Sequence, residues 1–266
     1  MTGRSLEGGT EPVTRPVFHF LERLGAALER TTLNPTHLGG PDLDGLSSED
    51  RRSLVALLGE GEISGMIKPG PGETGEVRYL RESVYPGIWL LGSRPEGGEG
   101  VVLSSIEVGR APGILLSPPE PSSFLASGGL APDDPAAVRL RPQLMNALPL
   151  MEEAAHHLAT FGPIGKNHRI FLNKLPLSEG DAEWIDRVCS QGRISLVSKG
   201  YGDCQVLSTG FSGLWRVLYK NPEGIPLLDA LSVADIPDEI AATPEDIRQA
   251  LEDYRDFLEW IARDLS

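Results

Sequence analysis

The chain contains an internal duplication, and this feature constrains its fold more than any other. Three blocks recur in the same order with small gaps between them: Leu46–Ile67 aligns with Leu177–Ser198, Gly87–Trp89 with Gly213–Trp215, and Ile106–Val108 with Leu231–Val233. The repeated unit is roughly 110–120 residues long, which exceeds the period of solenoid repeats. The sequence therefore predicts a tandem pair of similar lobes, and segments that differ between the copies are candidates for function.

Residue patterning divides the chain into four parts. Residues 1–16 lack periodicity and are expected to form a disordered N-terminal lead-in. Residues 17–115 form the first repeat lobe, residues 116–142 a linker rich in Pro, Ser and Gly, and residues 143–266 the second lobe with a C-terminal helix. Because each copy combines helices with runs of short strands, we predict an α+β fold. Each lobe is expected to be a mainly antiparallel sheet with helices packed on one side.

Hydrophobic periodicity and capping residues predict the individual elements. Helices are expected over Val17–Glu29 and Leu148–Phe161. Three more are expected after capping residues: one that starts after Ser47 or Ser48 and ends near Leu58, one that starts after Ser178, and one that starts at Pro244 after Thr243. Strands are expected at Glu62–Ile67, Glu76–Leu80, Gly87–Leu91, Val101–Val108, Arg169–Leu172, Arg193–Ser198, Cys204–Thr209, Leu214–Lys220 and Ile225–Val233. Asn221–Gly224 has the residues of a type I turn and predicts a hairpin. The aligned Trp89 and Trp215 are expected in the core.

Charge and composition exclude several classes of protein. The formal net charge of −14 argues against a nucleic-acid partner, whose phosphates require Lys and Arg, and is compatible with a solvated surface or with steering toward a basic partner. No apolar run approaches the ~20 residues of a membrane span. No basic segment followed by an apolar stretch begins at Met1, so we expect no secretory signal and a cytoplasmic location. The two cysteines suit a reducing compartment, and Cys189 is expected in the core.

The copies differ most between their first two predicted strands. The first copy carries the longer loop Pro69–Gly75, and the second carries the shorter segment Gly200-Tyr201-Gly202-Asp203-Cys204. Two glycines around a tyrosine allow a sharp turn with positive φ. The segment is either a tight hairpin with a shielding aromatic side chain or a partner or ligand contact built from Tyr201, Asp203 and Cys204. A nucleophilic role for Cys204 is disfavoured because no histidine lies nearby in the sequence.

Other chemistry-bearing patterns are absent from the sequence. Pro69–Gly75 lacks the Gly-Lys-Ser/Thr ending of a phosphate-binding loop and precedes a strand candidate, so it is expected to be a mobile loop. His156 and His157 are adjacent on a predicted helix, point in different directions and cannot share a metal ion. There is no His-Glu-x-x-His or Cys-x-x-Cys spacing, nucleophile elbow or dinucleotide fingerprint. We therefore expect no enzyme activity, no cofactor and no metal.

The second copy resembles the conserved C-terminal region of the HupH/HyaF hydrogenase expression proteins. The segments that carry the resemblance are Gly200–Cys204, Ser208-Thr209, Trp215–Val217 and Leu228–Val233. In the first copy, Glu82–Trp89 and Ile106–Val108 are similar to the earlier half of that family, and Asn146–Pro149 and Leu175–Ser178 match as well. The chain departs from this pattern in a short lead-in before Val17. In addition, Thr31–Asp44 lacks the apolar strand that Arg169–Leu172 provides in the second copy.

This resemblance implies an accessory chaperone that helps mature [NiFe] uptake hydrogenases. The implied partners are the iron–sulfur small subunit precursor and possibly other maturation proteins. Gly200, Tyr201, Gly202, Asp203 and Cys204 are the candidate partner-binding residues. Two alternatives stay open: a thiol-dependent or metal-handling enzyme centred on Cys204, and a small-ligand binding module that uses a cleft between the lobes.

Overall fold

The computed structural model describes residues 13–34, 39–69, 75–94, 100–116, 143–161, 167–189, 192–200 and 203–265. Most of the predicted lead-in, residues 70–74 of the Pro69–Gly75 loop and nearly all of the predicted linker fall outside these ranges. So do Tyr201 and Gly202, two of the candidate site residues.

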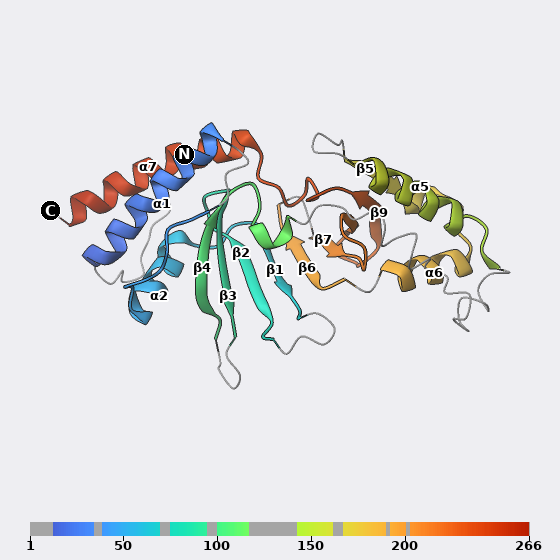
Figure 1. Ribbon diagram of the computed structural model, residues 1–266, viewed down its shortest axis with the longest axis horizontal. Coiled ribbons are helices and arrows are strands. Elements are labelled where there is room, and N and C mark those ends of the chain that lie inside the picture. The colour runs from blue at the N-terminus through green and yellow to red at the C-terminus, as the bar shows by residue number, and fades with distance from the viewer. Residues whose placement is uncertain are drawn as a thin grey trace.

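The described strands form one antiparallel sheet of nine strands in the order β4-β3-β2-β1-β6-β7-β8-β9-β5 (Figure 1). Their bounds are β1 Ile63–Ile67, β2 Arg78–Glu82, β3 Ile88–Ser93, β4 Val102–Val108, β5 His168–Phe171, β6 Ile194–Ser198, β7 Asp203–Ser208, β8 Leu214–Lys220 and β9 Pro226–Val233. The predicted α+β class and antiparallel pairing are confirmed. The strands of the two aligned copies join edge to edge in this sheet, so they do not form separate sheets.

The two copies meet where β1 pairs with β6. Their register places Gly65 opposite Leu196, with Ile63 opposite Ser198 and Ile67 opposite Ile194. A Cβ atom at Gly65 would lie 2.4 Å from the carbonyl oxygen of Ser195, so this close approach requires glycine.

Five α-helices accompany the sheet among the described residues: α1 Arg15–Leu33, α2 Ser48–Leu58, α5 Ala147–Thr160, α6 Glu179–Cys189 and α7 Pro244–Asp264. Short 3₁₀ turns lie at η1 Gly113–Leu115 and η3 Leu172–Lys174. The helix α1 starts earlier than predicted because Thr14 caps it and a proline occupies its first turn. The caps predicted at Ser47 and Thr243 are present, each closed by an aspartate three residues later.

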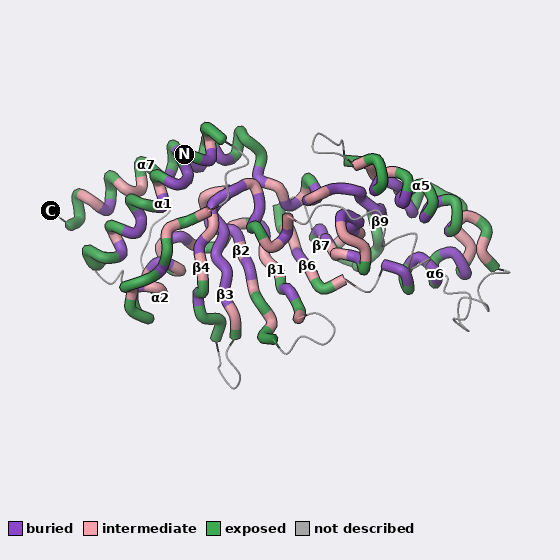
Figure 2. The backbone as a smooth tube through the Cα atoms, in the orientation of Figure 1, coloured by how far each residue is buried: buried purple, intermediate pink, exposed green. Residues whose placement is uncertain are grey.

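All five helices lie on the same side of the sheet. Ile88 and Leu90 of β3 pack into one core with α1, α2 and α7, while Leu231 and Val233 of β9 pack into a second core with α5 and α6. Cross-strand pairs place these residues on one face of the continuous sheet. Figure 2 shows buried residues concentrated in the strands and on the inward sides of the helices. The helix α7 follows the second copy in sequence but packs against α1, where the Tyr254 hydroxyl donates to the Leu21 carbonyl at 3.0 Å.

A third core covers the opposite face of the sheet. It joins Trp89 and Trp215 to two chain segments without strands, which contribute Ala111, Leu115, Ala234, Ile236 and Ile240. Trp89 is fully buried and Trp215 is 4% exposed, which confirms the predicted core placement of both. No helix within the described ranges is long and apolar enough to cross a membrane.

Candidate functional site

A cavity of about 610 Å³ opens on the face of the sheet that the helices leave uncovered, where the two copies meet. Its floor comes from β1, β6, β7 and β8, through Ile63, Ser198, Cys204 and Tyr219. The segment from Asp238 to Asp246 and the turn after β2 complete its walls. We call this cavity the acidic pocket.

Backbone hydrogen bonds, one between the copies and one within the first copy, fix the floor of the acidic pocket. The amide of Lys199 donates to the carbonyl of Glu62 at 3.0 Å, and the amide of Gly61 donates to the carbonyl of Glu82 at 2.9 Å. Gly200 then lies against the Glu62 carboxylate, where a Cβ atom would come within 2.1 Å of Oε2. The glycine therefore leaves room for that carboxylate at the mouth of the pocket.

Five carboxylates line the acidic pocket: Glu62, Glu82, Asp238, Glu239 and Asp246. Its described lining includes no Lys, Arg or His. Asp246 is held by the cap of α7, where it accepts from the Thr243 amide at 2.9 Å, and Asp238 accepts from the Asn167 side chain at 2.7 Å. Low-dielectric walls with charges of one sign focus a negative potential, which favours a cationic group in the pocket.

Glu82 is the buried member of this set, with only 5% of its surface exposed. Burial is the main cause that raises the pKa of its carboxyl to about 7, and the neighbouring charges of Glu62 and Asp246 raise it further. The amide of Gly87 donates to its Oε1 at 3.1 Å and partly opposes this rise. A cation bound nearby would favour the ionised form of Glu82.

Glu239 is already paired with a cation from outside the lining. Arg169 Nη2 on β5 lies 2.8 Å from Glu239 Oε1, and the Glu239 side chain is only 8% exposed. This ion pair fastens the pocket wall to the edge strand. The carboxylates that face solvent are therefore those of Glu62, Asp238 and Asp246.

Cys204 lies on the pocket floor and is 2% exposed. Burial raises the pKa of its thiol to about 11, although a hydrogen bond with the Tyr219 side chain opposes the rise. Burial likewise raises the pKa of Tyr219, and the bond to Cys204 adds to this effect. Because the thiolate is the nucleophile, a thiol that stays protonated near neutral pH disfavours the thiol-enzyme alternative.

The structure separates the candidate site residues predicted from the sequence. Gly200 and Cys204 line the acidic pocket, whereas Asp203 is exposed and points to the other face of β7, because side chains alternate along a strand. Tyr201 and Gly202 lie outside the described residues. Sequence reasoning missed Glu82 and the Asp238–Asp246 wall, because only the fold brings them to Cys204.

A second cavity, of about 470 Å³, lies on the helix side of the sheet near the same junction. It is mostly apolar and is lined by strand residues of both copies, including Met66, Leu90, Leu103 and Val197, together with Val55 of α2. We call it the apolar cavity. Its volume is in the range of small-molecule sites.

Comparisons with known proteins agree on one family. The model of the HupH hydrogenase expression protein C-terminal conserved region matches residues 144–261. The chain is 30% identical to the hydrogenase expression/formation protein HoxQ of Cupriavidus necator, in an alignment covering 83% of this chain and 73% of the relative. It is also 30% identical to the hydrogenase-1 operon protein HyaF of Escherichia coli, with the same coverage of both chains.

Two further matches carry the HupH name. The chain is 27% identical to the hydrogenase expression/formation protein HupH of Rhodobacter capsulatus, over 92% of this chain and 82% of the relative. The solved structure of the hydrogenase expression protein HupH from Thiobacillus denitrificans is 30% identical, has a TM-score of 0.38, and covers 41% of this chain and 90% of its own. On the sequence matches, the chain belongs to the HupH family of hydrogenase expression proteins.

Proposed function

We propose that this protein is a non-catalytic accessory factor for the maturation of [NiFe] hydrogenase and that it binds the iron–sulfur small subunit precursor in the cytoplasm. Several of its relatives are named as hydrogenase expression/formation proteins, which supports a role in hydrogenase maturation. The single observation that carries the binding role is the acidic pocket, built from both copies around Gly200 and Cys204.

The chemistry of the acidic pocket indicates which part of a client it accepts. The exposed carboxylates of Glu62, Asp238 and Asp246 surround an opening beside the apolar floor residue Ile63. A Lys or Arg side chain of the precursor would bring positive charge to these carboxylates and lay its methylene stem on the apolar floor. The overall charge of −14 would speed the encounter with a basic segment.

Capture of the small subunit precursor by tagged protein tests this proposal. Glu62→Lys with Asp238→Lys reverses two exposed charges of the pocket, and we expect it to reduce capture at least tenfold. The matched control, Glu252→Lys with Asp256→Lys, makes the same charge change on the exposed side of α7 and should retain capture. Tyr201→Ala tests the partner contact predicted from the sequence in the same assay.

Two outcomes would overturn the proposal. If wild-type protein captured no hydrogenase subunit, the proposed client would be wrong. If the pocket and control variants lost capture equally, the loss would reflect net charge and not the acidic pocket. Circular dichroism of each variant separates lost binding from lost folding.

The apolar cavity favours a second candidate, a small-ligand binding module. A compound that occupies it should raise the melting temperature of the protein, since binding to the native state alone stabilises it. Ser195→Phe would fill the cavity and should abolish that shift while leaving client capture unchanged. A shift that survives this substitution would place the ligand elsewhere.

A further inference from the structure

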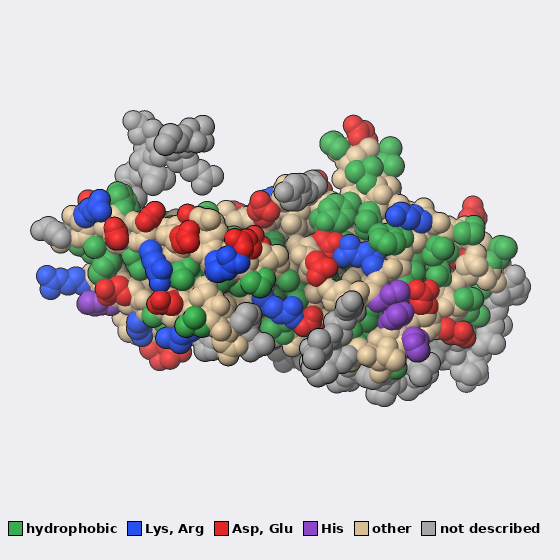
Figure 3. Space-filling view, turned by 90° about the horizontal axis from the view of Figure 1, so that it is seen from above, with side chains coloured by type: hydrophobic (Ala, Val, Ile, Leu, Met, Phe, Trp, Pro, Cys, Tyr) green, Lys and Arg blue, Asp and Glu red, His purple; other side chains and the backbone are tan. Residues whose placement is uncertain are grey.

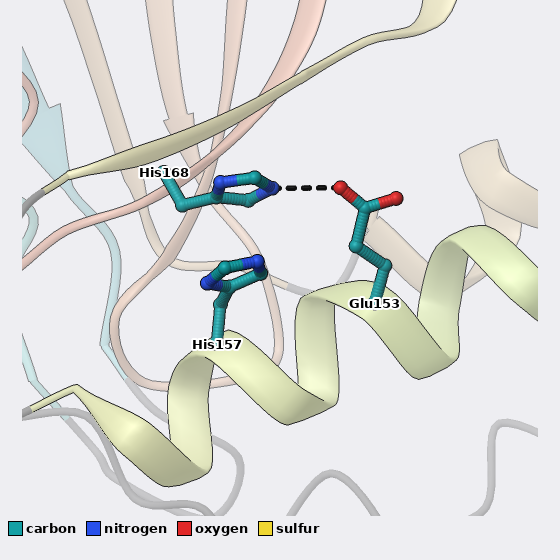
Figure 4. A group of neighbouring side chains, drawn as sticks. All are labelled: Glu153, His157 and His168. Atoms are coloured by element: carbon teal, nitrogen blue, oxygen red, sulfur yellow. Dashed lines mark hydrogen bonds and ion pairs between the residues drawn. The ribbon is translucent and has the colours of Figure 1, made fainter.

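Two histidines and a glutamate meet between α5 and the edge strand β5 (Figure 4). Glu153 and His157 are four residues apart on α5 and share one face of the helix, and His168 is the first residue of β5. His168 Nε2 lies 2.7 Å from Glu153 Oε1. The His157 and His168 rings stack, with 3.4 Å between centroids and 12° between planes. One possible ligand atom from each side chain lies within 4.8 Å of the other two.

The packing below the cluster fixes the two elements that carry it. Leu150, Ala154 and Leu158 on the buried side of α5 enter the core that also contains Ile170 of β5. The backbones that carry the three ligands are therefore held by apolar contacts. Only side-chain rotation is needed to change the spacing of the ligand atoms.

The chemistry of the cluster suits a cation. His157 and His168 each offer an imidazole nitrogen, and imidazole nitrogen is a common metal ligand. Glu153 contributes a negative charge on the same side of the helix.

We propose that Glu153, His157 and His168 form a binding site for a divalent transition-metal ion of the Zn²⁺ type. Two imidazole nitrogens and one carboxylate oxygen are a common three-residue zinc ligand set, whereas Mg²⁺ prefers oxygen ligands. Zinc binds these atoms at roughly 2.0–2.2 Å, so all three must converge more closely than they do now. The Glu153 and His157 side chains would have to rotate toward His168 for the three to converge.

The site is open to solvent on one side. The side chains of His168 and Glu153 are 30% and 44% exposed, so an ion can enter and a fourth coordination position faces water. Figure 3 shows histidine side chains gathered at the surface over the half of the molecule that contains α5, with an acidic side chain beside them. A bound ion would fasten α5 to the four-residue strand β5, which pairs only with β9 among the described strands.

Zinc titration of the full-length protein with a chromogenic competitor tests the site. We expect one equivalent to bind, with affinity reduced about tenfold or more by His157→Ala and by His168→Ala, and less by Glu153→Gln. His156→Ala removes the adjacent histidine, and His19→Ala removes the histidine of an exposed pair, His19 Nδ1–Glu22 Oε2 at 3.0 Å on α1. Both controls should bind zinc like wild type, and Mg²⁺ should not compete.

Two further measurements exclude zinc binding elsewhere on the protein and unfolding of the variants as explanations. Co²⁺ should give the visible absorption of a low-symmetry nitrogen and oxygen site in wild type and in His156→Ala, but not in His168→Ala. Thermal unfolding without metal shows whether each variant is folded. The proposal would be overturned if wild type bound no zinc, or if folded His157→Ala and His168→Ala variants bound zinc as tightly as wild type.

Discussion

In both halves of the sheet, a serine and an aspartate close the start of the helix before the first aligned strand. Ser47 caps α2 and pairs with Asp50, while Ser178 caps α6 and pairs with Asp181. The surroundings of the two carboxylates differ. Asp50 also accepts the hydroxyl of Thr14 at 2.7 Å. Asp181 instead accepts the three backbone amides at the start of α5, from Met145, Asn146 and Ala147, at 2.8 to 3.0 Å. The capping aspartate therefore links two helices in each half. Asp50 reaches α1 through the side chain of its cap residue, whereas Asp181 reaches α5 through backbone amides.

A second difference concerns how the middle helix of each half meets the sheet. Leu90 on β3 lies in the apolar core with Leu54 and Leu58 of α2. The aligned residue of the second half is Arg216, which bonds Asp229 Oδ2 at 2.7 Å and also pairs with Asp186 of α6. Apolar packing in one half is thus replaced by an ion-pair network in the other. The duplication preserves the strand positions and leaves the contacts above them free to diverge.

The largest expected effect separates the two aspartates. Asp181→Asn should lower the free energy of unfolding by about 3–4 kcal/mol, because it removes a buried charge that accepts four backbone amides. Burial alone would raise the pKa of Asp181, but these hydrogen bonds lower it to about 2. Asp50→Asn should cost only about 1 kcal/mol, since its partners are hydroxyls and a single amide. Urea unfolding at pH 7 measures both values.

The same comparison has a pH signature. Since the folded-state pKa of Asp181 lies below 3.8, its contribution is present above pH 4 and is lost as the pH falls toward 2. Wild type should therefore lose most of its stability advantage over Asp181→Asn in that window. Equal costs for the two aspartates at pH 7 would refute the distinction between side-chain and backbone partners.

The next effect tests Glu82, whose aligned position in the second half is Ser208. Its folded-state pKa of about 7 lies above its ordinary value of 4.5, so it contributes stability below pH 4.5 that is lost as the pH rises through 7. Glu82→Gln keeps the acceptor for Gly87 without the charge. We expect it to match wild type at pH 4 and to exceed it by up to about 3 kcal/mol at pH 8.

Exposed Glu60 is the matched control for Glu82. Glu60→Gln should change the pH dependence of unfolding very little. A Glu82→Gln difference that does not grow between pH 5 and pH 8 would show that Glu82 ionises normally in the folded protein.

Local elements were the most predictable part of this molecule. Each predicted strand overlaps an observed one, and Leu214–Lys220 is matched at both ends, because alternation and turn residues act over short distances. The joining of the copies was not predictable, since no local signal announces that β1 pairs with β6. The packing of α7 on α1 is equally non-local.

The candidate sites show the same limit. Cys204 and Gly200 were found by comparing the copies, but the carboxylates that make their surroundings acidic come from β2 and from the Asp238–Asp246 segment. For the histidine cluster, a signal was present: Glu153 and His157 have the four-residue spacing of ligands on one helix face. Two possible ligands at this spacing do not by themselves predict a metal site, and His168 joins them only through the fold.

The smallest effect tests the similarity of the halves directly, at the aligned tryptophans. The indole Nε1 of Trp89 donates to the Gly109 carbonyl at 2.9 Å, and that of Trp215 donates to the Ala234 carbonyl at 3.1 Å. Each bond ties a strand to the segment that covers the third core. Phenylalanine at either position should cost about 2 kcal/mol, because it removes the donor and leaves a small cavity and an unpaired buried carbonyl. Since the burial and the partner are equivalent, we expect the two costs to agree within about 0.5 kcal/mol and to add in the double variant, as independent sites do.

Unequal losses of unfolding free energy would mean that the third core is not shared evenly between the halves. A double variant that loses more than the sum would mean that the two covering segments support each other across the junction.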